Sequence, residues 1–488
     1  MELLAALDIR PGERVALVGG GGKTGLACRL LEEARRRGWT ALFTTTTKLL
    51  SPEDGAGACM VGETDLEVLR RHLSATGSLF LAQRWLDEWE DPPAGSGHAQ
   101  PGGRQRKVGG FSPAEIEHLL NNLNPDLALV EADGSRHRPL KAPGDYEPVL
   151  PPATTLLAVV AGLSVLGRPL AEAAVHRPER VAELGCVPLG TPVDAALVAA
   201  VLGHPRGGLK GCPPEARAVA VLAQATGTRI AAGRAVARRL LPTGRFERVL
   251  LVDLDAPGST GEVWRSAPEG GLHVGPGCWP RVHAVVLAAG QSRRMGRNKL
   301  LLPLGGMPMV DYAVQAAVGS RAADVWVVLG EDAAVRAALL GQPVRFLDNP
   351  DWSEGQAASL RTAVAALPPW SDGVLFLAAD MPFVLPAHLD RLVECLRPGV
   401  AVVWSGYGDA RGVPALFGRE TFAAVLQLHG DTGGRALAGQ FSEEVVPAGF
   451  PRLDVDTPEA YEQACRQLKE DAAWEHSAPA DVYGTGCR

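Results

Sequence analysis

The stretch from Val285 to Lys299, VVLAAGQSRRMGRNK, decides how the second half of the chain folds. Its uncharged start is typical of a buried parallel strand, and the small residues after it would let a ligand approach the backbone closely. Four cations follow: Arg293, Arg294, Arg297 and Lys299. Because open α/β folds bind ligands at the carboxyl ends of strands, the pattern predicts a phosphate-binding loop for a nucleoside triphosphate. The alternative is an ordinary strand-to-loop connection with a solvated basic face.

The length and composition of the chain narrow the class of protein. With 488 residues the chain is too long for one hydrophobic core, so we expect two or three domains. The net charge of −7 argues against a general nucleic-acid binder. The eight cysteines form no Cys-x-x-Cys pair, which excludes a zinc knuckle of that type. No apolar run reaches the roughly 18 residues of a membrane span and no export signal is visible, so we expect a cytoplasmic protein without a membrane partner.

A glycine-rich loop predicts a second nucleotide site near the N-terminus. An apolar strand at 14–18 precedes it, a helical pattern covers 26–37, and the loop itself consists of Gly19, Gly20, Gly21, Gly22, Lys23 and Thr24. In a P-loop, backbone N–H groups cradle phosphates, the lysine neutralises them and the threonine hydroxyl binds Mg²⁺. We therefore predict ATP or GTP here, with Thr24 as a metal ligand. Leu17 stands where the Walker A pattern has glycine, so the loop is similar to the Gly-x-x-Gly-Lys-Thr form of Mur ligases. The alternative is a glycine turn with a surface lysine.

Two acidic residues follow the strand predicted at 127–130. Glu131 and Asp133 lie where a Walker B motif delivers its carboxylates, so Glu131 or Asp133 would hold Mg²⁺ through water or orient an attacking water. Glu131 is the preferred metal candidate. The alternative is an acidic cap or turn.

Three further stretches of the first half have local meanings. The hydroxyl-rich turn at 44–48 would meet phosphate, metal or substrate, or is simply a strand end. Proline, glycine and arginine at 92–110 predict a surface loop. Ser112 and Pro113 predict a helix start with an N-cap and proline in the first helical position.

These motifs together resemble the YqeC proteins, accessory factors associated with selenium-dependent molybdenum hydroxylases. The resemblance covers about residues 10 to 255 and rests on the motifs at 18–24, 44–48, 107–113, 131–136, 141–143 and 176–179. It implies a place in the maturation of a molybdenum hydroxylase and makes a hydroxylase apoenzyme a candidate partner. It implies no single reaction: nucleotide hydrolysis, simple nucleotide binding and a kinase-like role remain open.

The pattern after Lys299 continues as β-α-β. A helix is predicted from Met309 to Ala317 and a strand from Asp324 to Leu329. After a further strand at about residue 345, the stretch 355–360 enters a helix. Ser359 in this stretch would hold the base or ribose of the nucleotide, or serve only as a helix cap.

Carboxylates at two later positions predict the metal site of this domain. Asp380 ends an uncharged run where a ligand should lie, so we expect it to bind Mg²⁺. Asp454 and Asp456 alternate along an extended segment and point to opposite faces, so only one can reach the metal; Asp456 is preferred. The alternative is that Asp456 merely caps the last helix, predicted at 458–469.

The second half resembles the MobA-like molybdenum cofactor nucleotidyltransferases, in particular the MocA type that makes molybdopterin cytosine dinucleotide. The resemblance covers about residues 282 to 468 and rests on the motifs at 287–299, 380–382, 430–435 and 454–458. It implies that the nucleotide is bound by Leu287, Ala288, Ala289, Gly290 and Ser292, and that Asp431 and Arg435 contact the second substrate. The guanylyltransferase relatives have glycine at the position of Ala289, so its methyl group would narrow the pocket in favour of CTP.

The predicted fold is α/β, with a P-loop-like domain at 1–255 and a Rossmann-like nucleotidyltransferase domain with a mostly parallel sheet at 281–470. A glycine- and proline-rich linker is expected at 256–280 and a tail at 471–488. The last strand of the first domain is expected at 248–254.

The predicted reaction is transfer of CMP from CTP to molybdopterin with release of pyrophosphate. Arg294 and Lys299 would stabilise the triphosphate, while Asp380 and Asp456 hold Mg²⁺. Two alternatives stay open: GTP or a sugar phosphate as substrate, and a carrier that binds the molybdenum cofactor without transfer chemistry.

Overall fold

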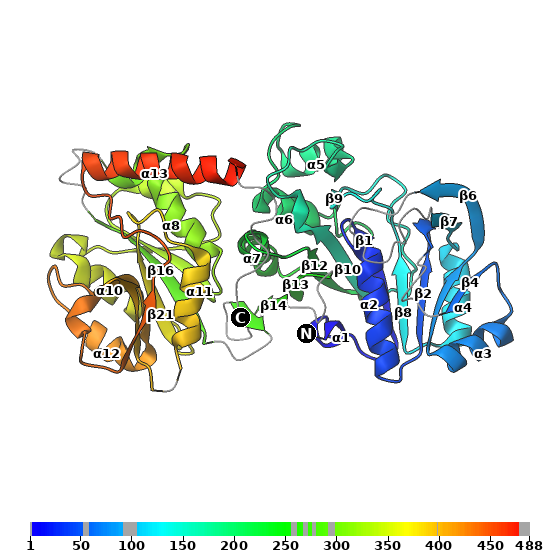
Figure 1. The fold of residues 1–488 in the computed structure, drawn as a ribbon. Coiled ribbons are helices and arrows are strands. Elements are labelled where there is room, and N and C mark those ends of the chain that lie inside the picture. The colour runs from blue at the N-terminus through cyan, green and yellow to red at the C-terminus, as the bar shows by residue number, and fades with distance from the viewer. Residues whose placement is uncertain are drawn as a thin grey trace. The chain divides into compact units, whose positions relative to one another are not determined.

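The computed structural model describes residues 2–51, 58–90, 105–254, 261–266, 272–275, 280–290, 298–397 and 399–477. The chain divides into two compact units, Met1–Gly277 and Cys278–Arg488 (Figure 1). Each unit is built on its own large sheet covered by helices, so the predicted α/β class with mostly parallel sheets is confirmed.

The first unit is built on a ten-stranded sheet in which eight neighbouring strands are parallel. Across the sheet, these eight are β4 (Ala58–Val61), β5 (Ser78–Ala82), β2 (Ala41–Thr45), β8 (Leu127–Glu131), β1 (Glu13–Gly19), β10 (Leu156–Gly162), β12 (Arg217–Ala223) and β13 (Arg248–Val252). β1 lies between β8 and β10, and the chain runs from β1 to one side of the sheet and later to the other. The carboxyl end of β1 is therefore a topological switch point, where open α/β sheets bind ligands.

Helices cover both faces of this sheet because alternate strand residues are apolar. Leu17, Phe43 and Val160 on one face pack against α1 (Leu3–Ala6) and α2 (Lys23–Arg36). Residues in the alternate positions pack on the other face against two groups of helices. The first group is α3 (Leu66–Thr76) and α4 (Pro113–Leu123), and the second is α5 (Pro178–Gly185), α6 (Ala195–Gly203) and α7 (Arg229–Leu240).

The composition of the interval 256–280 predicts a linker, but part of this interval belongs to the first sheet. Two strands of the first sheet lie in it, β14 (Gly261–Ser266) and β15 (Leu272–Gly275), and β14 pairs antiparallel with β13. Trp264 in β14 is fully buried, its ring lies 4.8 Å from the Arg238 guanidinium, and its Nε1 donates to Glu262 at 3.0 Å. Burial of this one large side chain anchors a segment whose glycines and prolines suggest a loop.

Smaller sheets complete the first unit. Part of the predicted surface loop at 92–110 forms β7 (Gln105–Gly109), which pairs antiparallel with β3 (Lys48–Leu50) and β6 (Arg84–Glu90); residues 91–104 lie outside the described residues. A two-stranded pair joins β9 (Leu140–Lys141) to β11 (Val175–His176).

The second unit has a seven-stranded sheet. Its order is β20 (Arg345–Asp348), β19 (Asp324–Leu329), β16 (Val282–Ala288), β21 (Gly373–Ala378), β23 (Ala410–Gly418), β22 (Val402–Tyr407) and β24 (Glu443–Pro447). The first four strands are parallel, and β23 is antiparallel to its neighbours. A small pair joins β17 (Pro303–Leu304) to β18 (Met307–Pro308). The carboxyl ends of β16, β21, β22 and β24 and the start of β23 therefore share one edge.

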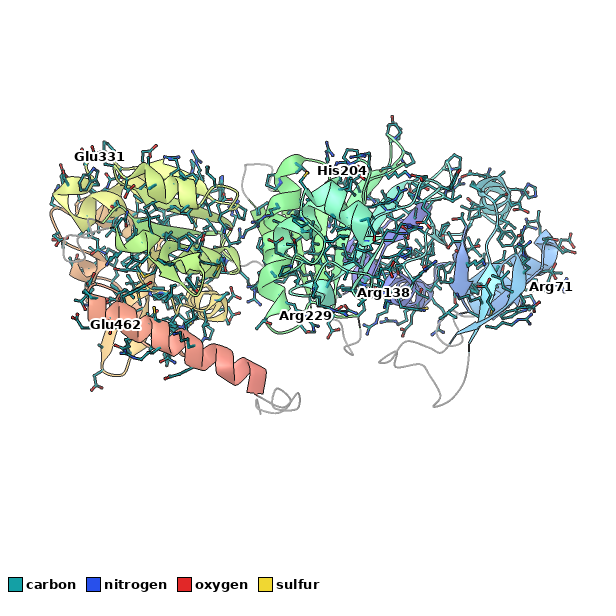
Figure 2. The ribbon with its side chains drawn as sticks, turned by 90° about the horizontal axis from the view of Figure 1, so that it is seen from above. Arg71, Arg138, His204, Arg229, Glu331 and Glu462 are labelled. Atoms are coloured by element: carbon teal, nitrogen blue, oxygen red, sulfur yellow. The ribbon has the colours of Figure 1, made fainter. Side chains whose placement is uncertain are left out.

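The helices of the second unit enclose this sheet. Strand residues such as Val285, Trp326 and Phe376 share a core with α10 (Gln356–Ala365) and α12 (Phe422–Val425). Further contacts come from α8 (Met309–Val318) and α11 (Pro386–Cys395), and α9 (Ala333–Ala338) precedes β20. The last helix, α13, runs from Pro458 to Ser477 and thus continues past residue 470, where the tail is expected to begin; Glu462 marks it in Figure 2.

Candidate nucleotide sites in the two units

Lys299 is the centre of the site in the second unit. Its Nζ lies 2.5 Å from Asp380 Oδ2 and 2.5 Å from Asp456 Oδ1. Lys299 is the first residue of a short 3₁₀ turn. Asn298 precedes it and caps the turn, because the Asn298 side chain accepts from Leu300 N at 3.0 Å. The cation is thus held at a defined turn between two carboxylates that are 81 and 157 residues away in the sequence.

Two strand-end segments deliver the carboxylates to this cation. Asp380 lies two residues after the end of β21, and its carbonyl accepts from Val455 N at 3.2 Å, which ties the segment 453–457 to the end of β21. Thr457, rather than Asp456, caps α13, because its hydroxyl accepts from Ala460 N at 3.3 Å. Asp456 is therefore available to contact Lys299.

The electrostatics of the cluster keep Lys299 charged. Burial alone would lower the pKa of Lys299, but the charges of Asp380 and Asp456 outweigh this and raise it. Asp454 lies beside the cluster: burial and the charge of Asp380 raise its pKa, and Arg452 Nε lies 3.9 Å from its Oδ2. Asp456 and not Asp454 is the second carboxylate on the lysine.

The donor set fits Mg²⁺ shared with a nucleotide. Mg²⁺ is commonly bound by one or two carboxylates, with water and substrate phosphate oxygens completing its shell. Asp380 and Asp456 supply two such carboxylates within reach of one ammonium group. Among the residues that the structure describes, no group of three or more His, Cys, Asp or Glu side chains is arranged as a metal site.

The predicted nucleotide-binding loop begins at the same edge. Leu287 and Ala288 end β16, and Ala289 and Gly290 follow it. A Cβ added to Gly330, at the end of β19, would lie 3.1 Å from the Ala289 carbonyl oxygen and 3.3 Å from the Trp352 ring. The two strand tips thus approach each other closely at Ala289. Ser292 and Arg294 lie outside the described residues.

Ser359 has a local partner. Its Oγ accepts from the buried Asn349 side chain at 3.1 Å, within the first turns of α10. Ser359 therefore does not cap α10 and instead fixes the segment that follows β20.

The two residues predicted to contact the second substrate lie beside different elements. Asp431 lies beside the start of α10, and Arg435 lies beside the first residues of β23. Asp431 Oδ1 accepts from Gln356 N, the first amide of α10, at 3.3 Å. Arg435 lies against the backbone of Gly412, since a Cβ on that glycine would be 2.8 Å from Arg435 Nη2. Both side chains therefore lie near segments at the carboxyl edge of the sheet.

In the first unit, close packing explains the glycine loop. Gly19, Gly21 and Gly22 have positive φ values of 98°, 73° and 123°. A Cβ on Gly19 would lie 2.1 Å from the Val160 carbonyl oxygen, and one on Gly20 would lie 2.5 Å from the carbonyl oxygen of Arg138, a residue labelled in Figure 2. The loop is thus pressed against the end of β10 and the segment after β8, as well as leading into α2.

Lys23 is buried and paired at this loop. Its Nζ donates to the Gly19 carbonyl oxygen at 2.6 Å and lies 3.2 Å from Asp133 Oδ1 and 3.6 Å from Glu131 Oε1. Thr24 donates to Glu131 Oε2 at 3.0 Å. The structure therefore brings together the lysine and threonine of the loop and the carboxylate at the end of β8, as the Walker-like pattern predicts. Thr24 and Glu131 offer adjacent oxygens that fit Mg²⁺.

Asp133 has more partners than the sequence indicates. Both its oxygens accept from Gly19 N at 3.1 Å, and Lys141 Nζ lies 3.0 Å from Oδ2. Lys141 also contacts Glu147 at 2.7 Å, and Arg177 donates to both Glu147 oxygens. We call Lys23, Asp133, Lys141, Glu147 and Arg177 the charge chain. The Asp133 carboxylate thus binds the glycine loop from the neighbouring segment, and Glu131 is the carboxylate beside Thr24.

Burial shifts several pKa values at this edge. Burial raises the pKa of Glu131 above its ordinary value, although Lys23 opposes the shift. Burial would lower the pKa of Lys23, but Asp133 and Glu131 raise it. Burial and the nearby charges of Arg177 and Lys141 lower the pKa of His176 to about 4, so it is neutral at pH 7.

The hydroxyl-rich turn after β2 serves the backbone. Thr45 donates to the Glu131 carbonyl oxygen at 2.9 Å, and Thr46 donates to the Val149 carbonyl oxygen at 2.9 Å. The turn thus joins the ends of β2 and β8, which agrees with the interpretation of this motif as a strand end.

No helix in the described part of the chain is both long and apolar enough to cross a membrane.

Two family models match the chain: the YqeC protein at residues 15–179 and the MobA-like NTP transferase domain at residues 284–445.

Several known proteins are similar to one part of the chain or the other. The uncharacterized protein YqeC of Escherichia coli is 32% identical over 206 residues, which are 42% of this chain and 73% of that protein. The purine catabolism protein PucB of Bacillus subtilis is 34% identical over 206 residues, 39% of this chain and 98% of that protein. The solved structure of Rv0371c from Mycobacterium tuberculosis is 34% identical, with 38% of this chain and 98% of that chain covered and a TM-score of 0.34. The predicted fusion is confirmed: the chain belongs to the YqeC family and to the MobA-like NTP transferase family, and its second unit is a nucleotidyltransferase domain.

Proposed function

We propose that the second unit transfers CMP from CTP to Mo-molybdopterin. The observation that carries the proposal is the contact of Lys299 with both Asp380 and Asp456 at the carboxyl edge of the sheet. A cation between two carboxylates provides both elements of phosphoryl transfer, a partner for the triphosphate and ligands for its Mg²⁺.

The reaction forms one P–O bond and breaks another. A terminal phosphate oxygen of molybdopterin attacks the α-phosphorus of CTP, and the bond from that phosphorus to the bridging oxygen of pyrophosphate breaks, so pyrophosphate leaves with the electron pair. Lys299 would stabilise the negative charge on the leaving group, together with Arg294 from the basic loop. Asp380 and Asp456 would hold Mg²⁺, which when bound neutralises the phosphates.

Ala289 supports CTP over GTP. Gly330, at the end of β19, lies close both to the Ala289 backbone and to the Trp352 ring, so the chain is closely packed on this side of Ala289. Its methyl group would narrow the pocket further and favour a pyrimidine. Asp431 and Arg435 are proposed to contact the molybdopterin substrate.

For the first unit, we propose nucleotide binding at the glycine loop. Asp133 already accepts from Gly19 N, so the phosphates would lie at the amides of Gly21 to Thr24, at the start of α2. Thr24 and Glu131 would hold the metal of ATP or GTP. Membership of the YqeC family supports a role beside the transferase in maturing a molybdenum hydroxylase, and a hydroxylase apoenzyme is the proposed protein partner.

The test is pyrophosphate release with molybdopterin and CTP, GTP or ATP. We expect release with CTP, and a loss of at least about 100-fold in kcat for Asp380→Ala and Lys299→Ala, since one electrostatic contact to a transition state is worth about 3 kcal/mol. Arg397→Ala is the matched control, because it removes an ion pair with Glu444 on the same unit. Wild-type turnover in Asp380→Ala would contradict the assignment, and binding of molybdopterin without pyrophosphate release would support a carrier.

A further inference from the structure

A chain of hydrogen bonds that starts at the exposed Arg391 and continues through the buried His388 and Ser405 lies behind the proposed acceptor side of the second unit. Arg391 Nη2 lies 3.1 Å from His388 Nδ1, His388 Nε2 lies 2.7 Å from Ser405 Oγ, and Ser405 Oγ lies 2.5 Å from the Pro414 carbonyl oxygen. His388 on α11 is 1% exposed and Ser405 on β22 is 0% exposed. No step of the proposed reaction uses these side chains.

The groups at the two ends of this series of hydrogen bonds determine which atom donates and which accepts in each bond. A guanidinium can only donate and a carbonyl oxygen can only accept. His388 Nδ1 therefore accepts from Arg391, its Nε2–H donates to Ser405, and the Ser405 hydroxyl donates to Pro414. Burial and the charge of Arg391 lower the pKa of His388 to about 4, so the neutral ring that this direction requires is present at pH 7.

The chain ends on the segment that supports Arg435. Besides the Pro414 carbonyl, the neighbouring Val413 carbonyl oxygen accepts from Tyr407 Oη at 2.7 Å. Gly412 comes next and lies against the Arg435 guanidinium. Because β23 is antiparallel to β21, its first residues lie at the same edge as Asp380.

We propose that His388 and Ser405 are positioning residues for the phosphorylated acceptor: they fix the segment Gly412–Pro414, and through it the guanidinium of Arg435. This inference rests on the proposed function, in which Arg435 contacts the acceptor. It adds two residues that lie in none of the sequence motifs. Neither side chain touches substrate, so the expected effect is on acceptor binding rather than on the chemical step.

The same unit contains a matched control. His283 and Ser371 form a second buried histidine–serine pair, with Nδ1 3.2 Å from Oγ, and both are 0% exposed. His283 lies at the start of β16 and Ser371 precedes β21, so this pair lies at the amino edge of the sheet, away from Lys299 and Asp380. Ser371→Ala and Ser405→Ala remove the same kind of bond at opposite edges.

The kinetic test compares these two variants. We expect Ser405→Ala to raise the KM for molybdopterin about tenfold, which corresponds to about 1.4 kcal/mol, because the variant loses the hydroxyl that joins His388 to the Pro414 carbonyl; kcat and the KM for CTP should stay within about twofold of wild type. Ser371→Ala should leave all three constants unchanged. His388→Leu should behave like Ser405→Ala, whereas His388→Gln, which keeps an N–H donor near Nε2, should restore the low KM. Equal constants in Ser405→Ala and Ser371→Ala would overturn the proposal.

A second measurement is independent of the reaction. Amide hydrogen exchange at Ala410 to Val413 should be at least about tenfold faster in Ser405→Ala than in wild type, and unchanged in Ser371→Ala. Unchanged exchange in Ser405→Ala would overturn the positioning role even if the enzyme has another acceptor. Faster exchange together with no pyrophosphate release in wild type would instead keep the positioning role for this segment and reject the proposed function.

Discussion

Ala289 is the residue on which nucleotide choice should depend. We expect Ala289→Gly to shift the ratio of kcat/KM for CTP to that for GTP by about tenfold toward GTP, since one methyl group in a pocket is worth about 1–3 kcal/mol. The measurement is pyrophosphate release with each nucleotide. Ala284→Gly is the control, because it removes the same methyl group from a buried position near the amino end of β16, away from the loop, and should affect stability alone. An unchanged ratio in Ala289→Gly would remove the argument for CTP.

Glu147 is the residue that should make the first unit acid-sensitive. Burial would raise its pKa, but hydrogen bonds from Arg177 and Lys141 lower it to about 2. A carboxylate with a lowered pKa in the folded state stabilises the fold above its unfolded pKa, near 4.5, and this contribution is lost as pH falls from about 5 to about 2. Urea unfolding should show Glu147→Gln less stable than wild type at pH 7, by on the order of 3 kcal/mol, and this deficit should fall to about a quarter of that size at pH 2.5.

The control for this prediction is Asp145→Asn. Asp145 lies in the same loop as Glu147 and pairs with Arg180 of α5 at 2.8 Å, but Asp145 is exposed and Arg180 is only half-buried, so the pair should contribute little. Equal losses in the two variants at pH 7, or a Glu147→Gln deficit that is as large at pH 2.5 as at pH 7, would show that the charge chain does not stabilise the unit.

At the scale of elements, α4 shows how local sequence sets a helix start. Ser112 accepts from Glu115 N, and the Glu115 carboxylate accepts from Ser112 N at 2.7 Å, which is a capping box with Pro113 in the first helical position. We expect Ser112→Ala to lower the free energy of unfolding of the first unit by about 1 kcal/mol. Urea unfolding followed by circular dichroism measures it. Ser112→Asn should restore most of the loss, and equal effects of both variants would exclude capping as the cause.

α13 shows the opposite case, in which local sequence leaves two solutions. From the sequence, Asp456 is the preferred metal ligand, and the alternative is that it caps the helix that begins at Pro458. In the structure Thr457 caps the helix and Asp456 contacts Lys299. The choice is decided by a lysine 157 residues away.

At the scale of the molecule, each unit has its own core and its own proposed nucleotide site. Among the described residues, the cores around Leu202, Val160 and Leu119 consist of first-unit side chains and the core around Phe376 consists of second-unit side chains, so we expect two unfolding transitions by calorimetry. CTP with Mg²⁺ at about 100 times its Kd should stabilise the second unit by about 2.7 kcal/mol, and ATP or GTP should do the same for the first.

Variants in each loop provide the controls. Lys23→Ala should abolish the shift with ATP or GTP and leave the shift with CTP, and Asp380→Ala should do the reverse. If Lys23→Ala leaves nucleotide affinity unchanged, the glycine loop is not the binding site. A single transition that both nucleotides shift together would argue against independent units.

The sequence alone determined those features whose physical cause lies within a few residues. A glycine loop before Lys23 and Thr24, an uncharged strand ending in Asp380 and the cap at Ser112 are all encoded locally, and the structure places each at a strand or helix end. The α/β class follows from the same local alternation of strands and helices.

Only the tertiary structure decided which distant groups meet. Asp133 becomes the partner of Gly19 and Lys141, Trp264 turns an expected linker into a strand, and His388 reaches Pro414 through Ser405. Each of these contacts joins segments that no short sequence pattern relates, and each is favoured because burial makes an unpaired charge or hydrogen-bonding group costly. The tertiary structure therefore decides which buried polar groups pair at the edge of the sheet, whereas the motifs that lie at that edge can be identified from the sequence.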